Sequence, residues 1–324
     1  MRAVTRGTDA LRRLKVEHTR ARADWRANWL RREPFDWRAL LACAIGGAAL
    51  YPLTRHLPFL GHDWIVYFSV LDRVPNFYAY PPWTQAALLP LNQGTQLQGI
   101  ALLNSLLLMT VAIAAAREGR WFSRRSRLAA ALLAVLTPPV FQLMWQGNVA
   151  GLVLLGLVGL PLTLPYALLQ PNLAAWALVS RARWLLWAAA FGLLSLLLWG
   201  WWPGTMLDTI AADAQRITHP IALGWQALGW PSLLVGLALL PFTTADPLRL
   251  LALGAFLSPY LMPAHLALLL PALGRVAGRQ RWLLWGCCWL TLLPAMFLTG
   301  WSKAAALLFP LAVWWLLRRA NPAA

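Results

Sequence analysis

Long apolar runs without charge, separated by short segments that carry arginine, most constrain this 324-residue chain. Sixty per cent of its residues are hydrophobic and 12% are charged, too few charges to cover a water-soluble fold of this length. In hydrocarbon every backbone N–H and C=O must be satisfied within the structure, which leaves helices or a closed barrel. The Leu- and Ala-rich runs lack the alternation of barrel strands, so the sequence predicts an all-α integral membrane protein.

Hydropathy, interrupted at Pro, Gly and charge, predicts about ten membrane-spanning helices, several of them short or broken. They are expected near residues 37–54, 97–116, 128–144, 148–164, 184–200, 232–245, 248–259, 264–275, 282–299 and 303–317. Residues 164–180 must add no crossing or two, and we interpret them as a half-helix on the inner side. The expected organisation is one polytopic domain, 37–319, between a basic tail, 1–36, and a short cytoplasmic tail, 320–324.

The distribution of Lys and Arg predicts the orientation. With the amino terminus inside, 24 of the 28 basic residues fall on the inner side. The four outside are Arg55, Arg73, Arg216 and Lys303. We therefore expect a multi-pass plasma-membrane protein with both termini cytoplasmic and outer loops at about 55–96 and 201–231. The net charge of +17 does not indicate nucleic-acid binding, because the basic residues lie between apolar runs.

The basic tail, residues 1–36, has two interpretations. Its Leu and Trp residues recur among arginines, a pattern typical of helices that lie on an anionic cytoplasmic leaflet. The other interpretation is a solvated, partly disordered tail. Neither gives this segment a catalytic role.

Acidic residues are scarce, which limits acid–base chemistry on the outer side. The four predicted to lie there are Asp63, Asp72, Asp208 and Asp213. The first outer loop combines Asp63 with His62, several aromatic residues and a Pro-Pro pair at the mouth of an apolar bundle. A carboxylate there can take a proton from a hydroxyl, and aromatic rings can stack on a sugar or cover a prenyl chain. The alternative is a surface loop whose Asp caps a short helix.

Other polar candidates also have two interpretations. Gln146 and Asn148 can bind sugar hydroxyls or satisfy the backbone at a broken helix. Arg216 and His219 can bind a phosphate or form a local ion pair in their loop. His265 lies at predicted membrane depth between two short helices, where an ionisable group is functional by default, with a satisfied core histidine as the alternative.

The first outer loop resembles that of a known family. The spacing from Asp63 to Tyr67 and the following Tyr80-Pro81-Pro82-Trp83 are similar to the polytopic glycosyltransferases of the C superfamily. The resemblance is strongest to family 87, the polyprenyl-phosphate-mannose-dependent mannosyltransferases. It implies a glycosyltransferase C-type bundle.

Two later segments extend the resemblance over most of residues 37–317. Trp145-Gln146-Gly147-Asn148 is similar to the family's Gly-Gln-x-Asn region, with the order of Gln and Gly changed. Ser258-Pro259-Tyr260 with His265 resembles its later Ser-Pro and His segment. One departure is Gln170-Pro171-Asn172, where the family often has a Lys before a Pro-Gln pair, and the chain is shorter than typical members.

The resemblance implies transfer of a sugar, expected to be mannose, from a polyprenyl-phosphate donor to a hydroxyl of a cell-envelope glycan or glycolipid. The reaction implied is an inverting displacement on the outer face, with Asp63 as the base. The expected donor and acceptor contacts are His62, Tyr67, Tyr78, Tyr80, Gln146, Asn148, Arg216, His219 and His265. The alternatives are a catalytically silent relative in a membrane complex, and a lipid or solute transporter with short broken helices.

No cofactor is expected beyond the lipid-linked donor, and membrane lipids are the expected surroundings. The outer loops lack an Asp-x-Asp or Asp-Glu pair of the kind that holds Mg²⁺ or Mn²⁺.

We predict that EDTA leaves the rate of sugar transfer by the purified protein unchanged. A collapse of that rate, restored by Mn²⁺, would reveal a metal site.

Overall fold

The computed structural model describes residues 2–31, 35–57, 61, 63–64, 81–91, 93–212 and 219–319. These residues form α-helices and short 3₁₀ helices, and no strand occurs among them. The predicted all-α class is therefore confirmed for the described part of the chain.

The first half of the chain is built from ten α-helices and one short 3₁₀ helix within the described ranges. They are α1 (Arg2–Asn28), α2 (Trp37–Thr54), α3 (Trp83–Leu88), η2 (Leu89–Leu91), α4 (Gln96–Glu118), α5 (Arg124–Val135), α6 (Pro138–Gln146), α7 (Ala150–Val158), α8 (Leu164–Ala167), α9 (Pro171–Leu178) and α10 (Ala182–Trp199). Most are shorter than a bilayer-spanning helix.

The second half is more finely divided, because Pro and Gly recur at the ends of its helices. Its elements are α11 (Trp202–Ala212), α13 (Trp225–Leu228), α14 (Trp230–Leu239), η3 (Leu240–Phe242), α15 (Pro247–Leu257), η4 (Pro263–Leu269), α16 (Ala272–Arg275), α17 (Gly278–Trp289), η5 (Leu290–Leu292), α18 (Leu293–Phe297), α19 (Gly300–Ala306) and α20 (Leu308–Arg319).

Three helical segments in the described part are long and apolar enough to cross a membrane. They are Gln96–Glu118, Ala182–Trp199 and Gly300–Arg318. The pair α5 and α6, bent by 50° where Pro138 begins the second helix, makes a fourth if it is one broken span. Every predicted run contains helix, and several are short or broken as expected. The number of ten crossings stays a prediction.

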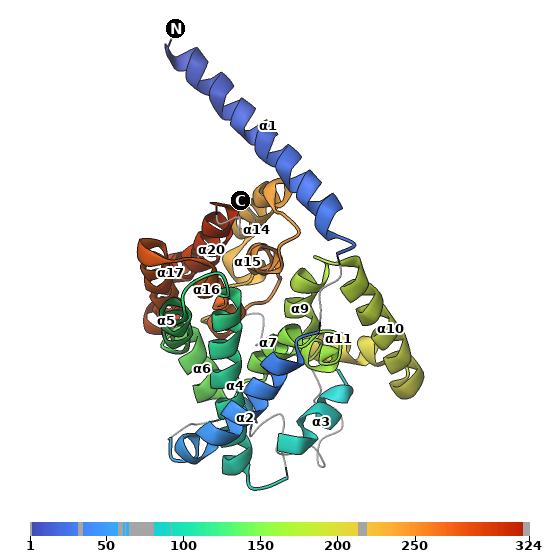
Figure 1. Cartoon of the computed structure of the whole chain (residues 1–324). Helices are drawn as coiled ribbons and strands as arrows, with labels where there is room; N and C mark the ends of the chain where they lie inside the picture. Colours follow the sequence, from blue (N-terminus) through green and yellow to red (C-terminus); the bar gives the residue numbers. More distant parts are fainter. Residues whose placement is uncertain are drawn as a thin grey trace.

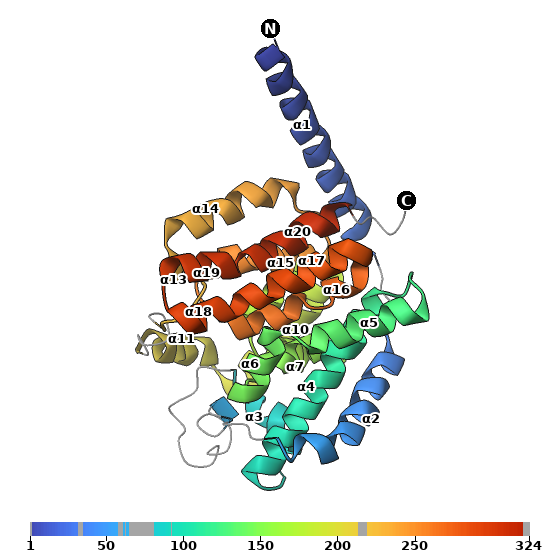
Figure 2. The same ribbon diagram turned by 90° about the vertical axis from the view of Figure 1, so that its left-hand side faces the viewer.

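The bundle has two distinct ends (Figure 1). We define the inner end as that of α1 and the carboxyl end of α20, and the outer end as that of α3 and the amino end of α4. The helix α4 runs between the two ends and packs against α2, α5, α7 and α16 (Figure 2). The short element η4 is buried along its whole length and packs against α6 and α7, so irregular backbone lies inside the protein.

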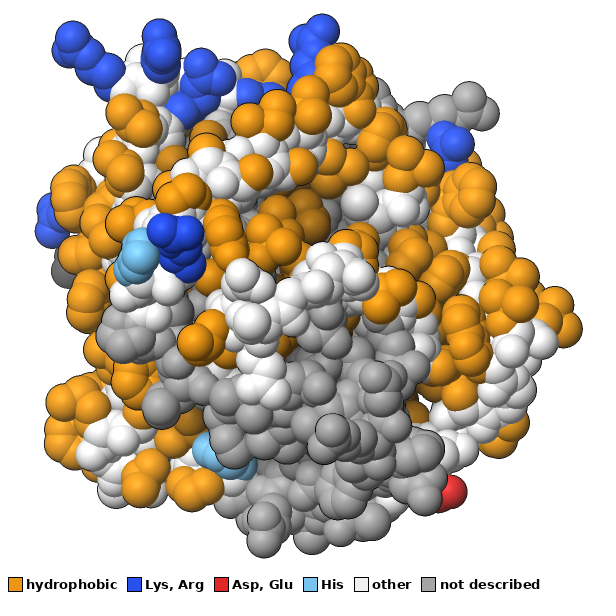
Figure 3. Space-filling model, turned by 90° about the horizontal axis from the view of Figure 1, so that it is seen from below, with side chains coloured by type: hydrophobic (Ala, Val, Ile, Leu, Met, Phe, Trp, Pro, Cys, Tyr) orange, Lys and Arg blue, Asp and Glu red, His pale blue; other side chains and the backbone are white. Residues whose placement is uncertain are grey.

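The helix α10 packs against the core through Trp184, Ala188 and Phe191 and exposes most of its other apolar side chains. Leu186 and Leu197 are 70% and 84% exposed. In Figure 3, which views the outer end from below, apolar side chains gather around the rim of the molecule. A helix that is apolar on all sides and so little covered by protein fits a hydrocarbon surrounding.

The amino-terminal tail is a continuous helix, α1, whose first turns project beyond the bundle (Figures 1 and 2). Its second half contacts the protein. Trp25 donates its indole N–H to Thr243 O at 3.0 Å, and Trp29 O accepts from Ala182 N at 3.0 Å. The tail is therefore helical over Arg2–Asn28, and its position on a membrane leaflet stays a prediction.

Residues 164–180 differ from the single half-helix that we expected. They form two short helices, α8 and α9, because Pro171 begins a new helix after a turn. Much of this segment is buried, including Leu169 and Ala174. Whether it crosses the membrane stays open to test.

Candidate functional site

The structure brings together Asp63 and Asn148, two residues predicted from separate parts of the sequence. The Asn148 side chain donates its amide N–H to Asp63 Oδ2 at 2.7 Å. Asn148 is 6% exposed, and Asp63 is half-buried. The carboxylate expected to act as a base is thus held against the break between α6 and α7.

The local sequence explains the position of Asn148. Gly147 ends α6 in the left-handed conformation, at φ +65°, which glycine adopts without steric cost. Asn148 N then donates to Leu143 O at 3.0 Å, and its Oδ1 accepts from Ala150 N at 2.8 Å, where α7 begins. The side chain therefore satisfies backbone at a broken helix, one of its two interpretations, and also binds the carboxylate.

The start of the first outer loop is anchored to the same break. Gly61 N donates to Trp145 O at 3.0 Å, and Trp64 is fully buried. A Cβ added at Gly147 would lie 2.9 Å from Trp64 Cβ and 3.1 Å from Gly61 Cα. Two glycines thus permit the close approach that places Asp63 beside Asn148.

His265 does not line a large cavity. Its Nδ1 accepts from Met262 N at 3.2 Å, and its ring meets Tyr260 edge to face, with centroids 6.2 Å apart. The adjoining cavity, also lined by Trp176 and Ser258, has about 20 Å³, enough for one water molecule. These contacts favour the interpretation as a satisfied buried histidine.

Of the remaining predicted site residues, Gln146 and His219 lie in the described part of the chain. Gln146 is half-buried at the end of α6. His219 is exposed, and partial desolvation together with the charge of Lys303 lowers its pKa, so it is mostly neutral at pH 7. Outside the described residues lie His62, Tyr67, Tyr78, Tyr80 and Arg216.

A larger cavity, of about 900 Å³, lies at the inner end, and sequence reasoning did not find it. We call it the inner cavity. Its charged lining is Arg20, Asp24, Arg31, Arg117, Glu118, Arg120, Arg181, Asp246, Arg249, Arg275 and Arg318. Eight arginines thus face three acids in one space.

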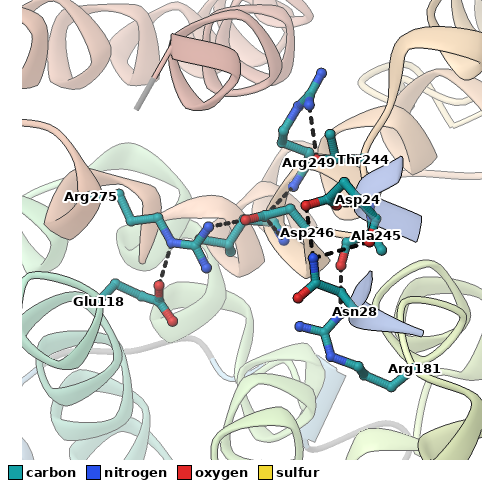
Figure 4. Close-up of polar contacts among 10 residues, drawn as sticks. Asp24, Asn28, Glu118, Arg181, Thr244, Ala245, Asp246, Arg249 and Arg275 are labelled. Carbon is teal, nitrogen blue, oxygen red and sulfur yellow. Dashed lines mark hydrogen bonds and ion pairs between the residues drawn. The ribbon is translucent and has the colours of Figure 1, made fainter. Parts of the chain in front are cut away.

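In the inner cavity, Arg275 lies between Glu118 and Asp246 and pairs with both (Figure 4). The close approach of α16 to α4 makes this possible, since a Cβ on Gly274 would lie 2.0 Å from Ala115 O. Asp246 also caps α15, accepting from Arg249 N at 3.1 Å. Burial alone raises the pKa of the Asp246 carboxyl, but Arg275 and the cap hydrogen bonds hold it below its usual range.

The helix α1 closes one side of this cavity. Asp24 Oδ2 accepts from Ala245 N at 2.9 Å, and Asn28 donates to Asp24 Oδ1 at 2.8 Å (Figure 4). Arg181 donates to Ala245 O at 2.6 Å. One turn of backbone before α15 is therefore held from two sides.

One feature of the sequence pointed to this cavity: acidic residues occur with arginines in the predicted inner segments. All eight arginines come from segments that the charge distribution places inside, and we used them only to predict orientation. Asp24, Glu118 and Asp246 are acids in those same inner segments. Acids kept beside arginines at the ends of apolar runs indicate ion pairing, which the count of charges alone does not reveal.

No group of three or more His, Cys, Asp or Glu side chains able to hold a metal occurs among the residues that the structure describes. The expectation of a metal-independent reaction stays a prediction. Comparison with protein-family models, curated proteins and solved structures found no match for this chain. The glycosyltransferase resemblance therefore rests on its short motifs and on their positions.

Gly147→Ala tests the α6–α7 break. We expect the free energy of unfolding to fall by about 3 kcal/mol, because the left-handed backbone strains an L-residue and the new Cβ meets Trp64. Gly192→Ala is the control, since its Cβ meets nothing within 4 Å, and helix propensity predicts a small gain. The measurement is thermal unfolding in detergent, and equal stability of the two variants would contradict the assigned geometry.

Asp246→Asn tests the ion pair with Arg275. The side chain keeps its shape and loses its charge, and we expect the free energy of unfolding to fall by about 2 kcal/mol. This is less than for a fully buried pair, because Glu118 still pairs with Arg275.

The stability difference between wild type and Asp246→Asn should shrink as the pH falls. The lowered folded pKa means that the stabilisation is complete above the ordinary carboxyl pKa, about 3.9, and is lost as pH falls through the folded value. The control is Asp208→Asn at an exposed carboxylate. A pH-independent difference between wild type and Asp246→Asn in unfolding midpoint would disprove the charge effect.

Proposed function

We propose that this chain is a multi-pass membrane glycosyltransferase that moves a sugar from a polyprenyl-phosphate donor to an acceptor hydroxyl on the outer face. Mannose is the sugar that the sequence resemblance favours. The observation that carries the proposal is the hydrogen bond from Asn148 to Asp63, which joins two of the motifs behind the resemblance.

The geometry suits Asp63 as a general base. Asn148 binds one carboxylate oxygen, which fixes the orientation of the group. A carboxylate can accept several hydrogen bonds, including one from a substrate hydroxyl. In the proposed step Asp63 takes the hydroxyl proton as the acceptor oxygen bonds to the anomeric carbon. The bond from that carbon to the lipid phosphate breaks on the opposite face, and the phosphate leaves with its electron pair.

The leaving phosphate requires positive charge or oriented donors. Lys303 is a described cation in a segment predicted to lie outside, and His219 lies close enough for the Lys303 charge to lower its pKa. His265 is a weaker candidate, because its ring nitrogen Nδ1 already binds the backbone. The arginines of the inner cavity belong to the opposite predicted side of the membrane and are not assigned to this step.

Asp63→Asn tests the proposal. The assay measures transfer of radiolabelled sugar from polyprenyl-phosphate-mannose to membrane lipids by purified protein in detergent. We expect transfer to fall at least ~100-fold, because general-base catalysis contributes about that much or more. Asp208→Asn is the control, an equivalent change at an exposed carboxylate of the other predicted outer loop.

Full turnover by folded Asp63→Asn would remove Asp63 from the mechanism. No transfer by the wild type with this donor would favour the catalytically silent relative, which is then expected to purify at fixed stoichiometry with membrane partners.

A further inference from the structure

Two arginines of the inner cavity, Arg275 and Arg249, are held by polar groups of the protein. Arg275 is bound by Glu118 and Asp246, while Arg249 donates to Thr244 Oγ1 at 2.9 Å and to Phe242 O at 2.8 Å. These contacts come from α4, α15, α16 and the turn before α15. They hold the side chains of Arg275 and Arg249 in defined positions in the cavity lining (Figure 4).

Two further arginines of the lining are paired outside it. Arg117 contacts Asp36 at 3.3 Å, and Arg318 pairs with Glu17. Those carboxylates reduce the positive charge on their two sides of the cavity.

Three arginines of the lining lack such compensation. Arg20 and Arg31 on and after α1, and Arg120 after α4, are exposed and form no ion pair with a carboxylate in the described parts of the chain. Arg120 stacks on Trp121, with 4.9 Å from the guanidinium carbon to the ring centroid. Arg20, Arg31 and Arg120 thus place positive charge on exposed side chains of the cavity lining.

The lining of the same cavity also includes apolar side chains. Leu154 and Leu157 of α7, Leu251 of α15 and Leu268 of η4 belong to its lining. A volume of about 900 Å³ lies within the range of sites for organic ligands and is far larger than one phosphate requires. Arginines and apolar walls together match an amphiphile with an anionic head.

We propose that the inner cavity binds a lipid through its phosphate head group. Arg20, Arg31 and Arg120 bind the phosphate oxygens with charge-assisted hydrogen bonds, and the leucine wall contacts the beginning of the hydrocarbon chains. The predicted cytoplasmic position of this end suits an anionic leaflet. The site is independent of Asp63 and of sugar transfer.

The test is lipid binding by the full chain, purified in detergent and measured by native mass spectrometry. Dioleoyl phosphatidic acid is the probe, dioleoyl phosphatidylcholine is the zwitterionic comparison, and inorganic pyrophosphate tests a free phosphate compound. We expect one phosphatidic acid per chain, bound roughly tenfold or more tightly than phosphatidylcholine.

The triple variant R20A/R31A/R120A should weaken phosphatidic acid binding at least ~10-fold. R22A/R26A/R125A is the matched control, because it removes the same charge from exposed arginines that do not line the cavity. Binding by this control should stay at the wild-type level. Thermal unfolding of both variants confirms that they are folded.

Equal weakening by the two triple variants, or wild-type binding by R20A/R31A/R120A, would overturn the proposal. Pyrophosphate binding as tight as phosphatidic acid, and lost in the same variant, would assign the cavity to a free phosphate compound and overturn the lipid source.

Discussion

The need to satisfy buried backbone polar groups governs this structure. Where α6 gives way to α7, the lost helical hydrogen bonds are replaced locally: Asn148 N binds Leu143 O, and the Asn148 side chain accepts from Ala150 N. A polar side chain is therefore required at the break for structural reasons. Its other end is free to hold Asp63, so the same residue that repairs the backbone also positions the carboxylate.

Charge at the inner end follows a second rule, that buried ions require partners. Arg275 lies between two carboxylates contributed by helices far apart in sequence, and this arrangement depends on the close contact of Gly274 with Ala115. The fold thus places paired opposite charges inside the protein and, within the described parts of the chain, leaves some unpaired arginines on its surface. The same set of inner-end arginines therefore supplies both the buried ion pairs and the exposed positive charge of the inner cavity.

The sequence predicted the all-α class, the positions of helical runs and many of their breaks, because apolar composition, Pro and Gly act locally. It also named Asp63 and Asn148, although their contact depends on Gly61 and Gly147, whose packing partners are distant in sequence. The inner cavity was missed because convergence of arginines is a tertiary property. The single half-helix at 164–180 was wrong because Pro171 starts a helix of its own after a turn.

The helix α10 has a further consequence for how this chain can change. Its outward side chains contact almost no protein, so their exact shapes have no complementary surface to match. Exchange among Leu, Ile, Val and Phe there preserves the affinity for hydrocarbon and alters no packing. The outward positions of this helix therefore require only an apolar residue, while the close contacts around Gly147 require one particular residue.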